Sequence, residues 1–435
     1  MIIQNATILD FRSRSLESGM DVHIQDGRVT AAGKELAREG TAGREDIIHA
    51  DGLYLIPGLV NTHAHTAMTL LRGAAEDCNV SDWFNKHVWL YEQNLRPEDV
   101  YWGTLLGAAE MLLAGVTCVA DHYFHMDHAW RAFQESGIRA DLAWAVFGAG
   151  DGWQKELDQA MEFTSAYRAR EPRLTVSLGP HSPYICPEPF LRTVADKAGA
   201  LGARMHIHVS EEKGQVERSL REKGKTPVEV LDTNGVLRAG TILAHCYHAT
   251  DSDLALVRER GAGIAHCAKT YLKFGDVHDF LPRALAAGVT VGLGSDGPAS
   301  NNTMSILETA RFAALLAKAS RRDPLAARVE EVLPLCHAGG QVLGLPHYGR
   351  VEPGCLADLV LVDPGTPSLV PALDPFANLL YSFSERSVHT VIVDGRVLVR
   401  QGKPVHLDLE QLSRKASEIA ERLKVRSAAK PMQTY

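Results

Sequence analysis

Two histidines follow a short apolar segment near the start of the chain. His63 and His65 end the run Pro57–His65. Residues i and i+2 of a strand point to the same face, so both imidazoles should point toward one place. Neutral imidazole is the commonest metal ligand in proteins. By itself the pair fits a metal site and a structural histidine pair equally well, so further ligands must come from elsewhere in the chain.

Other chemically active side chains end later apolar segments. His181, His208, His245 and Asp296 each end a predicted strand, and Glu211 follows His208 by three residues. The carboxyl ends of barrel strands meet at one face, which is where barrel enzymes place their chemistry. Three imidazoles and one carboxylate make a zinc shell that leaves one position for water. These strand ends therefore predict a metal site.

The elements that would position these residues alternate from about residue 59 to 346. Strands are predicted at 59–65, 116–121, 140–147, 174–181, 204–211, 240–245, 263–267 and 289–296. Helices are predicted at 98–114, 131–137, 155–168, 192–201, 226–233, 251–260, 281–288 and 304–319, and residues 71–97 are expected to be irregular. About eight strand–helix units predict an α/β fold, a (β/α)8 TIM-like barrel.

Both ends of the chain contain short strands separated by turns such as Asp26-Gly27 and Asp394-Gly395. We expect residues 1–57 and 351–405 to form one small β-sandwich, with the catalytic barrel of residues 58–350 inserted between them. Residues 406–435 are expected to form a terminal helix and tail.

Composition excludes several classes of partner. The 435 residues carry a net charge of −8, which argues against a nucleic-acid partner. No apolar run approaches the ~18 residues of a membrane span, and the N-terminus does not resemble a signal peptide. The seven scattered cysteines indicate neither a disulfide framework nor a zinc finger. A cytoplasmic location is the expectation.

Not every histidine can be a ligand. We expect His206 to lie in the core or behind the site, and His266 to be a pocket or structural residue. We expect His122, His125 and His128 to line a loop after Asp121, on the surface in preference to the alternative, which is contact with the substrate. His248 is expected to orient its neighbours, and the remaining histidines are expected to be structural or exposed.

Several segments resemble the amidohydrolase superfamily. The motifs are Pro57–His65, Met68–Asp77 with Trp83, Gly179–Tyr184, His208–Glu211, Ala244–Cys246 and Gly294–Asn302. Within the superfamily they resemble the branch that contains 5′-methylthioadenosine/S-adenosylhomocysteine deaminases and s-triazine chlorohydrolases. The resemblance extends from the N-terminal strands to about residue 405.

The resemblance implies roles for individual residues. The metal ligands fall on His63, His65, His208 and Asp296, and the metal is Zn²⁺, with Fe²⁺ as an alternative. Glu211 becomes the proton shuttle, His245 the residue that orients the water, and Asp296 the acceptor of the water proton. Glu92 and His181 are implied substrate contacts. Binuclear relatives carry a carboxylated lysine on the fourth strand, and its absence from residues 174–180 implies one metal per subunit.

The chain departs from the branch at two places. Trp144 and Trp153 stand where adenosine-type members carry arginines that grip the far end of the substrate. The segment Cys267–Lys273, which includes Lys269, replaces the usual Asn-Pro-x-Ser-Asn-x-Lys. Both changes argue against a substrate that bears the homocysteine carboxylate, and they favour a flat, uncharged one that Trp144 contacts.

The predicted function is therefore hydrolytic deamination of a small N-heterocycle. Metal-bound hydroxide would attack the amine-bearing ring carbon of a 5′-methylthioadenosine, S-adenosylhomocysteine or adenosine-like compound, with release of ammonia. The alternatives are an amino- or chlorohydrolase of a triazine, pterin or guanine-type ring, a cyclic amidase, and a non-catalytic barrel that binds a protein partner. The resemblance also implies a homo-oligomer.

Overall fold

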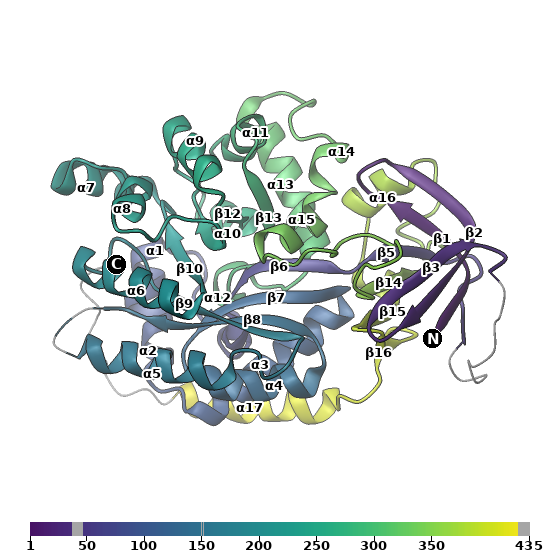
Figure 1. The fold of residues 1–435 in the computed structure, drawn as a ribbon, viewed down its shortest axis with the longest axis horizontal. Coiled ribbons are helices and arrows are strands. Elements are labelled where there is room, and N and C mark those ends of the chain that lie inside the picture. Colours follow the sequence, from purple (N-terminus) through teal and green to yellow (C-terminus); the bar gives the residue numbers. More distant parts are fainter. Residues whose placement is uncertain (37–46, 149, 151, 425–435) are drawn as a thin grey trace.

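The computed structural model describes residues 1–36, 47–148, 150 and 152–424, and it contains two sheets. An eight-stranded parallel sheet with helices around it forms the larger part of the molecule, and a mixed sheet lies at one end (right in Figure 1). The residues predicted to do chemistry lie in the larger part.

The parallel sheet closes into a barrel, as predicted. Its strands are β6 (Leu59–Ala64), β7 (Val116–Tyr123), β8 (Arg139–Val146), β9 (Leu174–Pro180), β10 (Arg204–Val209), β11 (Thr241–His245), β12 (Gly263–His266) and β13 (Thr290–Leu293). They pair in sequence order. A parallel bridge between Ala64 and Asp296 closes the ring, and the Asp296 amide donates to the His63 carbonyl at 2.9 Å. The closure thus brings the first and last predicted metal ligands together.

Helices cover the outside of the barrel. The longer ones are α3 (Pro97–Leu113), α4 (Met126–Ser136), α5 (Trp153–Tyr167), α6 (Glu188–Leu201), α9 (Asp251–Arg260) and α13 (Ile306–Arg321). Their ends have local causes: Thr250 caps α9 through the Asp253 amide, and Gly137 ends α4 with a φ of 80°. A residue without Cβ adopts that left-handed conformation at no steric cost.

The second sheet combines both ends of the chain. It contains β1 (Ile2–Asp10), β2 (Ser15–Gln25), β3 (Arg28–Lys34), β4 (Ile47–His49), β5 (Tyr54–Pro57), β14 (Leu359–Val362), β15 (Val388–Val393), β16 (Arg396–Arg400) and β17 (Lys403–Pro404). The N-terminal β5 pairs antiparallel with the C-terminal β14, so the two ends form one connected sheet, here called the end sheet. The exact domain boundaries given above stay predictions.

A buried ion pair connects the end sheet to the barrel. Arg139, the first residue of β8, donates from Nε and Nη2 to the two carboxylate oxygens of Asp358 at 2.8 and 3.0 Å. Both side chains are almost fully buried, with 6% and 1% exposed. A bidentate geometry of this kind fixes orientation as well as distance.

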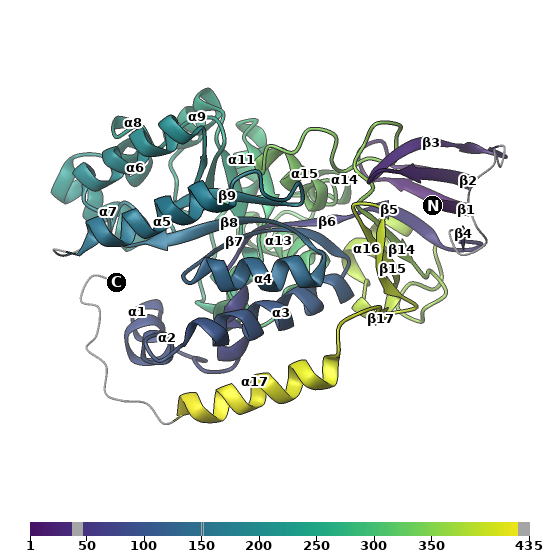
Figure 2. The same ribbon diagram turned by 60° about the horizontal axis from the view of Figure 1, so that its bottom comes forward.

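The terminal helix α17 (Leu409–Lys424) lies along α3 on the outside of the barrel (yellow in Figure 2). Arg422 pairs there with the nearly buried Asp99 at the start of α3. The helix predicted within residues 406–435 is present, and residues 425–435 lie outside the described part.

The prediction for residues 71–97 was wrong over residues 80–92. These form one continuous helical stretch, made of α1 (Val80–Asp82), a π-helical turn η3 (Trp83–Val88) and α2 (Trp89–Glu92), and η2 (Thr66–Leu71) precedes it. The π-helical turn interrupts the 3.6-residue period by which a helix is recognised. Further helices absent from the prediction are α7 (Lys213–Lys223), α14 (Val329–Val332), α15 (Leu335–Val342) and α16 (Pro375–Tyr381).

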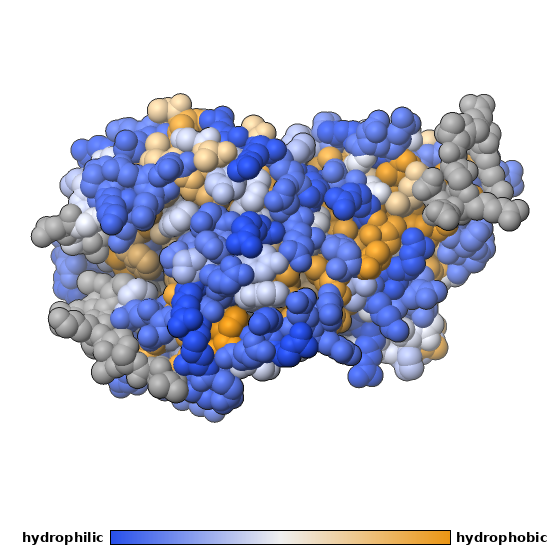
Figure 3. All heavy atoms as spheres, turned by 90° about the horizontal axis from the view of Figure 1, so that it is seen from below, coloured by the Kyte–Doolittle hydropathy of each residue, from blue (hydrophilic) through white to orange (hydrophobic). Residues whose placement is uncertain are grey.

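The remaining helices are also short: α8 (Pro227–Thr233), α10 (Ala268–Lys273), α11 (Phe280–Ala286), α12 (Pro298–Asn301) and η4 (Glu385–Ser387). None of the described helices combines the length and apolar character that crossing a membrane requires. Figure 3 shows that one face of the molecule is mostly hydrophilic, with hydrophobic residues exposed in smaller areas between.

Candidate metal centre and active site

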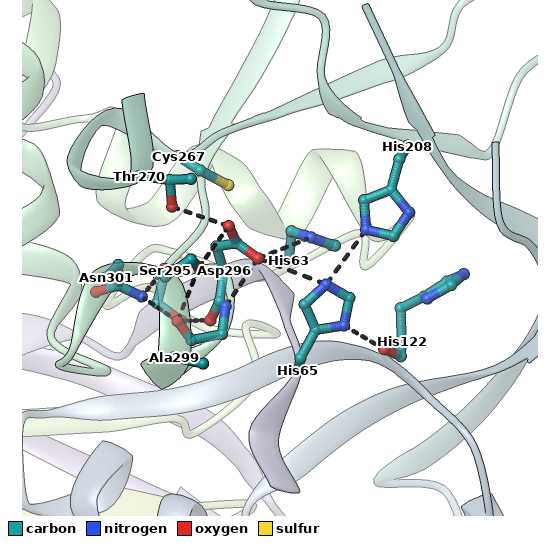
Figure 4. Close-up of polar contacts among 12 residues, drawn as sticks. His63, His65, His122, His208, Cys267, Thr270, Ser295, Asp296, Ala299 and Asn301 are labelled. Atoms are coloured by element: carbon teal, nitrogen blue, oxygen red, sulfur yellow. Dashed lines mark hydrogen bonds and ion pairs between the residues drawn. The ribbon is translucent and has the colours of Figure 1, made fainter. Parts of the chain in front are cut away.

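Three imidazoles converge at the C-terminal end of the barrel. His63 and His65 come from β6 and its end, and His208 comes from β10 on the opposite side (Figure 4). One nitrogen of each ring lies within 4.8 Å of the other two. This separation allows one ion to reach all three, since zinc–nitrogen bonds are about 2.0–2.1 Å long.

The hydrogen bonds of two of these rings show which nitrogens face the centre. His65 Nδ1 contacts the His122 carbonyl oxygen, and His208 Nδ1 contacts the His181 carbonyl oxygen at 2.9 Å. Carbonyl oxygens only accept, so both Nδ1 atoms donate, and in the neutral rings both Nε2 atoms carry lone pairs. These two lone pairs face each other at 3.2 Å. Such an arrangement repels unless a cation lies between, so these residues fit a divalent metal.

The third ring is oriented from behind. His63 Nδ1 lies 2.8 Å from His206 Nε2, and His63 Nε2 points into the centre without a hydrogen-bond partner among the described residues. Burial lowers the pKa of His63 to about 3, so the ring is neutral. His206 therefore lies behind the site, which is one of the two positions expected for it.

Asp296 offers one oxygen to the centre. Its Oδ2 accepts hydrogen bonds from the hydroxyls of Thr270 and Ser300, each at 2.8 Å. Its Oδ1 lies 3.6 and 3.4 Å from Nε2 of His63 and His65. Burial alone would raise the pKa of this carboxyl, but the imidazoles of His63, His65 and His245 beside it hold that pKa well below its usual range. Asp296 is thus an anion aimed at the three imidazoles.

Glu211 and His245 lie next to this cluster. Glu211 Oε1 is 3.7 Å from His245 Nε2, and the Tyr184 hydroxyl donates to Glu211 Oε2 at 3.4 Å. Burial, with the negative charge of Asp296, raises the pKa of Glu211 to about 8. Near neutral pH this carboxyl therefore holds a proton beside the metal centre, as a general acid must.

A small cavity of about 50 Å³ opens onto the imidazoles. It is lined by His65, His181 and His208, together with His122 and Phe147. The ring of His181 stacks on Phe147 at 4.9 Å. The expectation that His122 lies on a surface loop was wrong: it belongs to β7 and is 1% exposed. The strand runs two residues further than predicted and carries His122 into the site.

Sequence reasoning also missed Asp121. This buried carboxylate accepts from the Thr66 amide and hydroxyl, both at 2.7 Å, and so holds the chain just after His65. Burial raises its pKa to about 6. An acidic residue at the end of the apolar run that begins at Val116 was the available signal.

A second, larger cavity of about 470 Å³ adjoins the first and shares Glu92 and Phe147 with it. Glu92 is buried, accepts from the Tyr123 hydroxyl at 2.6 Å, and has its pKa raised to about 7 by burial. Trp144 lines this second cavity and not the first, because its ring packs on Phe163 of α5. Trp153 packs on Phe190 and is not among the described residues that line either cavity.

Several other predicted residues lie outside the cluster. Lys269 pairs with Glu308 at 2.6 Å. His248 pairs with Asp276 at 2.6 Å, and the buried His266 stacks on Phe280. These contacts support the loops around the site. They agree with the expectations that His248 orients its neighbours and that His266 is a pocket or structural residue.

Imidazoles and a carboxylate at the C-terminal end of a closed parallel barrel define a metal-dependent hydrolase. The Amidohydrolase family model matches residues 54–398. The chain is 38% identical over 432 residues to a 5-methylthioadenosine/S-adenosylhomocysteine deaminase of Pelotomaculum thermopropionicum, covering 97% of this chain and 98% of that protein. It is 35% identical over 434 residues to a 5′-deoxyadenosine deaminase of Methanosarcina mazei, covering 98% and 99%.

A solved structure shares this fold. An adenosine deaminase of Xanthomonas campestris with bound zinc superposes with a TM-score of 0.92 at 28% identity, over 97% of this chain and 98% of that one. The chain therefore belongs to the amidohydrolase family. It is an enzyme, a hydrolase that acts on carbon–nitrogen bonds.

Proposed function

We propose that this enzyme deaminates the purine of a 5′-substituted adenosine by hydrolysis, with one Zn²⁺ held by His63, His65, His208 and Asp296. The observation that carries the proposal is the geometry: three converging imidazoles, the carboxylate of Asp296 next to them, and the nearly buried carboxyl of Glu211 beside the cluster. A metal to activate water and an acid to protonate a ring nitrogen are the two requirements of this reaction.

The donor set fits zinc in its chemistry as well as its spacing. Neutral imidazoles and a single carboxylate oxygen suit a borderline-soft ion, and Fe²⁺ is the alternative. A bound Zn²⁺ would lower the pKa of a coordinated water to about 7 and so supply the nucleophile at neutral pH.

The protein side chains would transfer the protons and position the attacking oxygen. Asp296 Oδ1 faces the imidazoles and accepts one hydrogen bond, from the Gly297 amide at 2.8 Å, so a lone pair is left to take a proton of the attacking water. Glu211 would donate its proton to the ring nitrogen. The proton held by Asp296 would go to the amine, which leaves as ammonia, and the second water proton would restore Glu211 as the ring carbonyl forms. His245 lies 3.7 Å from Glu211 and can hold the attacking oxygen by a hydrogen bond.

The residues that line the second cavity favour one kind of 5′ group on the substrate. Its aromatic lining consists of Trp89, Phe124, Trp144 and Phe147, and its carboxylates are Glu92, Asp127 and Glu156. None of the described residues that line it is a lysine or an arginine. The histidines His125 and His128 also line it, and burial lowers the pKa of His125. The ammonium of a homocysteine group could pair with the carboxylates of the cavity, but its carboxylate would meet like charges and no lysine or arginine. We therefore place an uncharged 5′ group, hydrogen or methylthio, in this cavity, with Glu92 against the ribose and His181 near the base.

Ammonia release from the zinc-loaded protein tests the proposal. The panel contains 5′-methylthioadenosine, 5′-deoxyadenosine, adenosine, S-adenosylhomocysteine, guanine, a pterin and an amino-triazine. Ammonia from the first three, with kcat/KM for S-adenosylhomocysteine lower by roughly tenfold or more, is the expected result, since one unfavourable charge contact is worth about 1–2 kcal/mol. No ammonia from any purine nucleoside would refute the proposal.

A variant that changes the charge of the second cavity tests substrate preference without altering the residues at the metal centre. Glu156 lines only the second cavity, and its Oε2 accepts from the Phe147 amide at 3.4 Å. Glu156→Gln removes a negative charge and keeps an acceptor, so it should raise the ratio of kcat/KM for S-adenosylhomocysteine over methylthioadenosine. The matched control is Glu162→Gln, since Glu162 lies on the same helix and is not among the described residues that line the cavity.

Triazine and other heterocycle hydrolysis stay as alternatives that the same panel decides. The family and the relatives named as deaminases argue against a non-catalytic role. The homo-oligomer and the cytoplasmic location stay predictions.

A further inference from the structure

Tyr271 reaches the active site from the segment Cys267–Lys273. It belongs to the short helix α10 that follows β12, and its side chain is buried. Its hydroxyl has two partners among the described residues. The Cys267 amide lies 3.2 Å away and His245 Nδ1 lies 3.3 Å away.

The hydrogens can be assigned from these two contacts. A backbone amide only donates, so the Tyr271 oxygen accepts from Cys267. If Nδ1 were protonated and donated as well, the buried hydroxyl proton would have no acceptor among the described residues. Both groups are satisfied when the hydroxyl donates to His245 Nδ1, which accepts with a lone pair. A neutral imidazole with a lone pair on Nδ1 carries its proton on Nε2.

His245 Nε2 points into the metal centre. It is buried without a hydrogen-bond partner among the described residues, and it lies 3.7 Å from Glu211 Oε1. The ring lies 5.4 Å from that of His63 and 5.6 Å from that of His208, centroid to centroid. A proton on Nε2 therefore makes His245 a hydrogen-bond donor toward the place where the attacking oxygen must sit.

We propose that Tyr271 is a positioning residue that fixes the Nε2–H tautomer of His245, so that this histidine donates to the attacking oxygen and does not take its proton. Proton transfer is then left to Asp296 and Glu211. A fixed donor aimed at developing negative charge lowers the barrier because it needs no reorientation during the reaction.

The packing around Tyr271 supplies a matched control. Its ring stacks on that of Tyr247 at 3.7 Å and 10°. Tyr247 is equally buried, and its hydroxyl also accepts from a backbone amide, that of His278, at 2.7 Å. The hydroxyl of Tyr247 contacts the backbone of Asp276 and His278, and no contact joins it to His245. Phenylalanine at either position removes one buried hydroxyl and keeps the stack.

The test compares zinc-loaded Tyr271→Phe with Tyr247→Phe, both as the full chain, on the best substrate of the panel above. The inference rests on the proposed deaminase function for this kinetic part. We expect kcat of Tyr271→Phe to fall by roughly 10–100-fold with KM changed by less than about threefold, since the hydroxyl acts on the reacting atoms through His245. The control should keep kcat within about threefold and lose a similar amount of thermal stability.

A spectroscopic measurement does not depend on activity. Long-range ¹H–¹⁵N correlation spectra distinguish the protonated from the unprotonated nitrogen of each imidazole, and the His245 signals are those lost in His245→Asn. In the wild type Nε2 should carry the proton, and in Tyr271→Phe the two tautomers should mix.

A proton on Nδ1 in the wild type, an unchanged tautomer in Tyr271→Phe, or a kcat loss no larger than that of Tyr247→Phe would overturn the inference. A wild type that releases no ammonia from any nucleoside refutes the proposed function alone, and the spectra then decide the role of Tyr271.

Discussion

Replacing Glu211 by glutamine tests the proton transfer that we propose for it. Burial and Asp296 raise the pKa of Glu211 to about 8. At pH 7 a carboxyl with that pKa is about 90% protonated, whereas one with the ordinary value of 4.5 would be about 0.3% protonated. The environment thus makes the acid roughly 300-fold more available, which lies within the ~10²–10⁴-fold that general acid catalysis contributes.

Glu211→Gln keeps the size and the hydrogen-bonding atoms of the side chain but has no proton of suitable acidity. We expect kcat for ammonia release to fall by roughly 10²–10⁴-fold while the zinc content stays at the wild-type level. The measurements are steady-state ammonia release and metal analysis of the same preparation.

The neighbouring Glu212 provides the control for this variant. Glu212→Gln changes a carboxyl one residue away, at the start of α7, and should keep kcat within about tenfold. A Glu211→Gln enzyme with bound zinc and near wild-type turnover would refute the assignment of Glu211 as the acid.

Three further outcomes follow from the geometry. Thr270→Val removes the hydroxyl that holds Asp296 Oδ2 at 2.8 Å and should lower zinc affinity by about 10–100-fold in competition with a chelator, and an unchanged affinity would contradict the role given to Thr270. Activity should fall as the pH rises through about 8, because the pKa of Glu211 is raised and the acid form is lost there, and a pH–rate profile that stays level well above this value would disagree. Arg139→Ala leaves the buried Asp358 unpaired, so the free energy of unfolding in urea should drop by about 3–5 kcal/mol, and a loss below about 1 kcal/mol would mean that water reaches this pair.

Much of the fold could be predicted because the barrel strands are short apolar runs at regular spacing. The boundaries of β6, β9 and β10 are close to those predicted. Residues 80–92 were missed because the π-helical turn η3 interrupts the 3.6-residue period. Strand β7 was ended two residues too early, at Asp121, because the next residue, His122, is polar, although it is buried in the site.

The residues of the candidate site also fall into those that the sequence could predict and those that it could not. The types and spacing of His63, His65, His208 and Asp296 are readable in the chain, because each follows an apolar run that a parallel barrel directs to one end. Trp144 lines the second cavity and packs its ring on Phe163 of α5, so its predicted contact with the substrate stays a prediction.

The sequence by itself determined which atoms are available at the metal centre: neutral imidazole nitrogens, one aspartate oxygen and one glutamate. Only the tertiary structure decided what state each atom is in. His65 is oriented by the His122 carbonyl 57 residues away, and His63 by His206 at a distance of 143 residues. Tautomer and pKa depend on such partners and on burial, and both arise only when the barrel closes and excludes water.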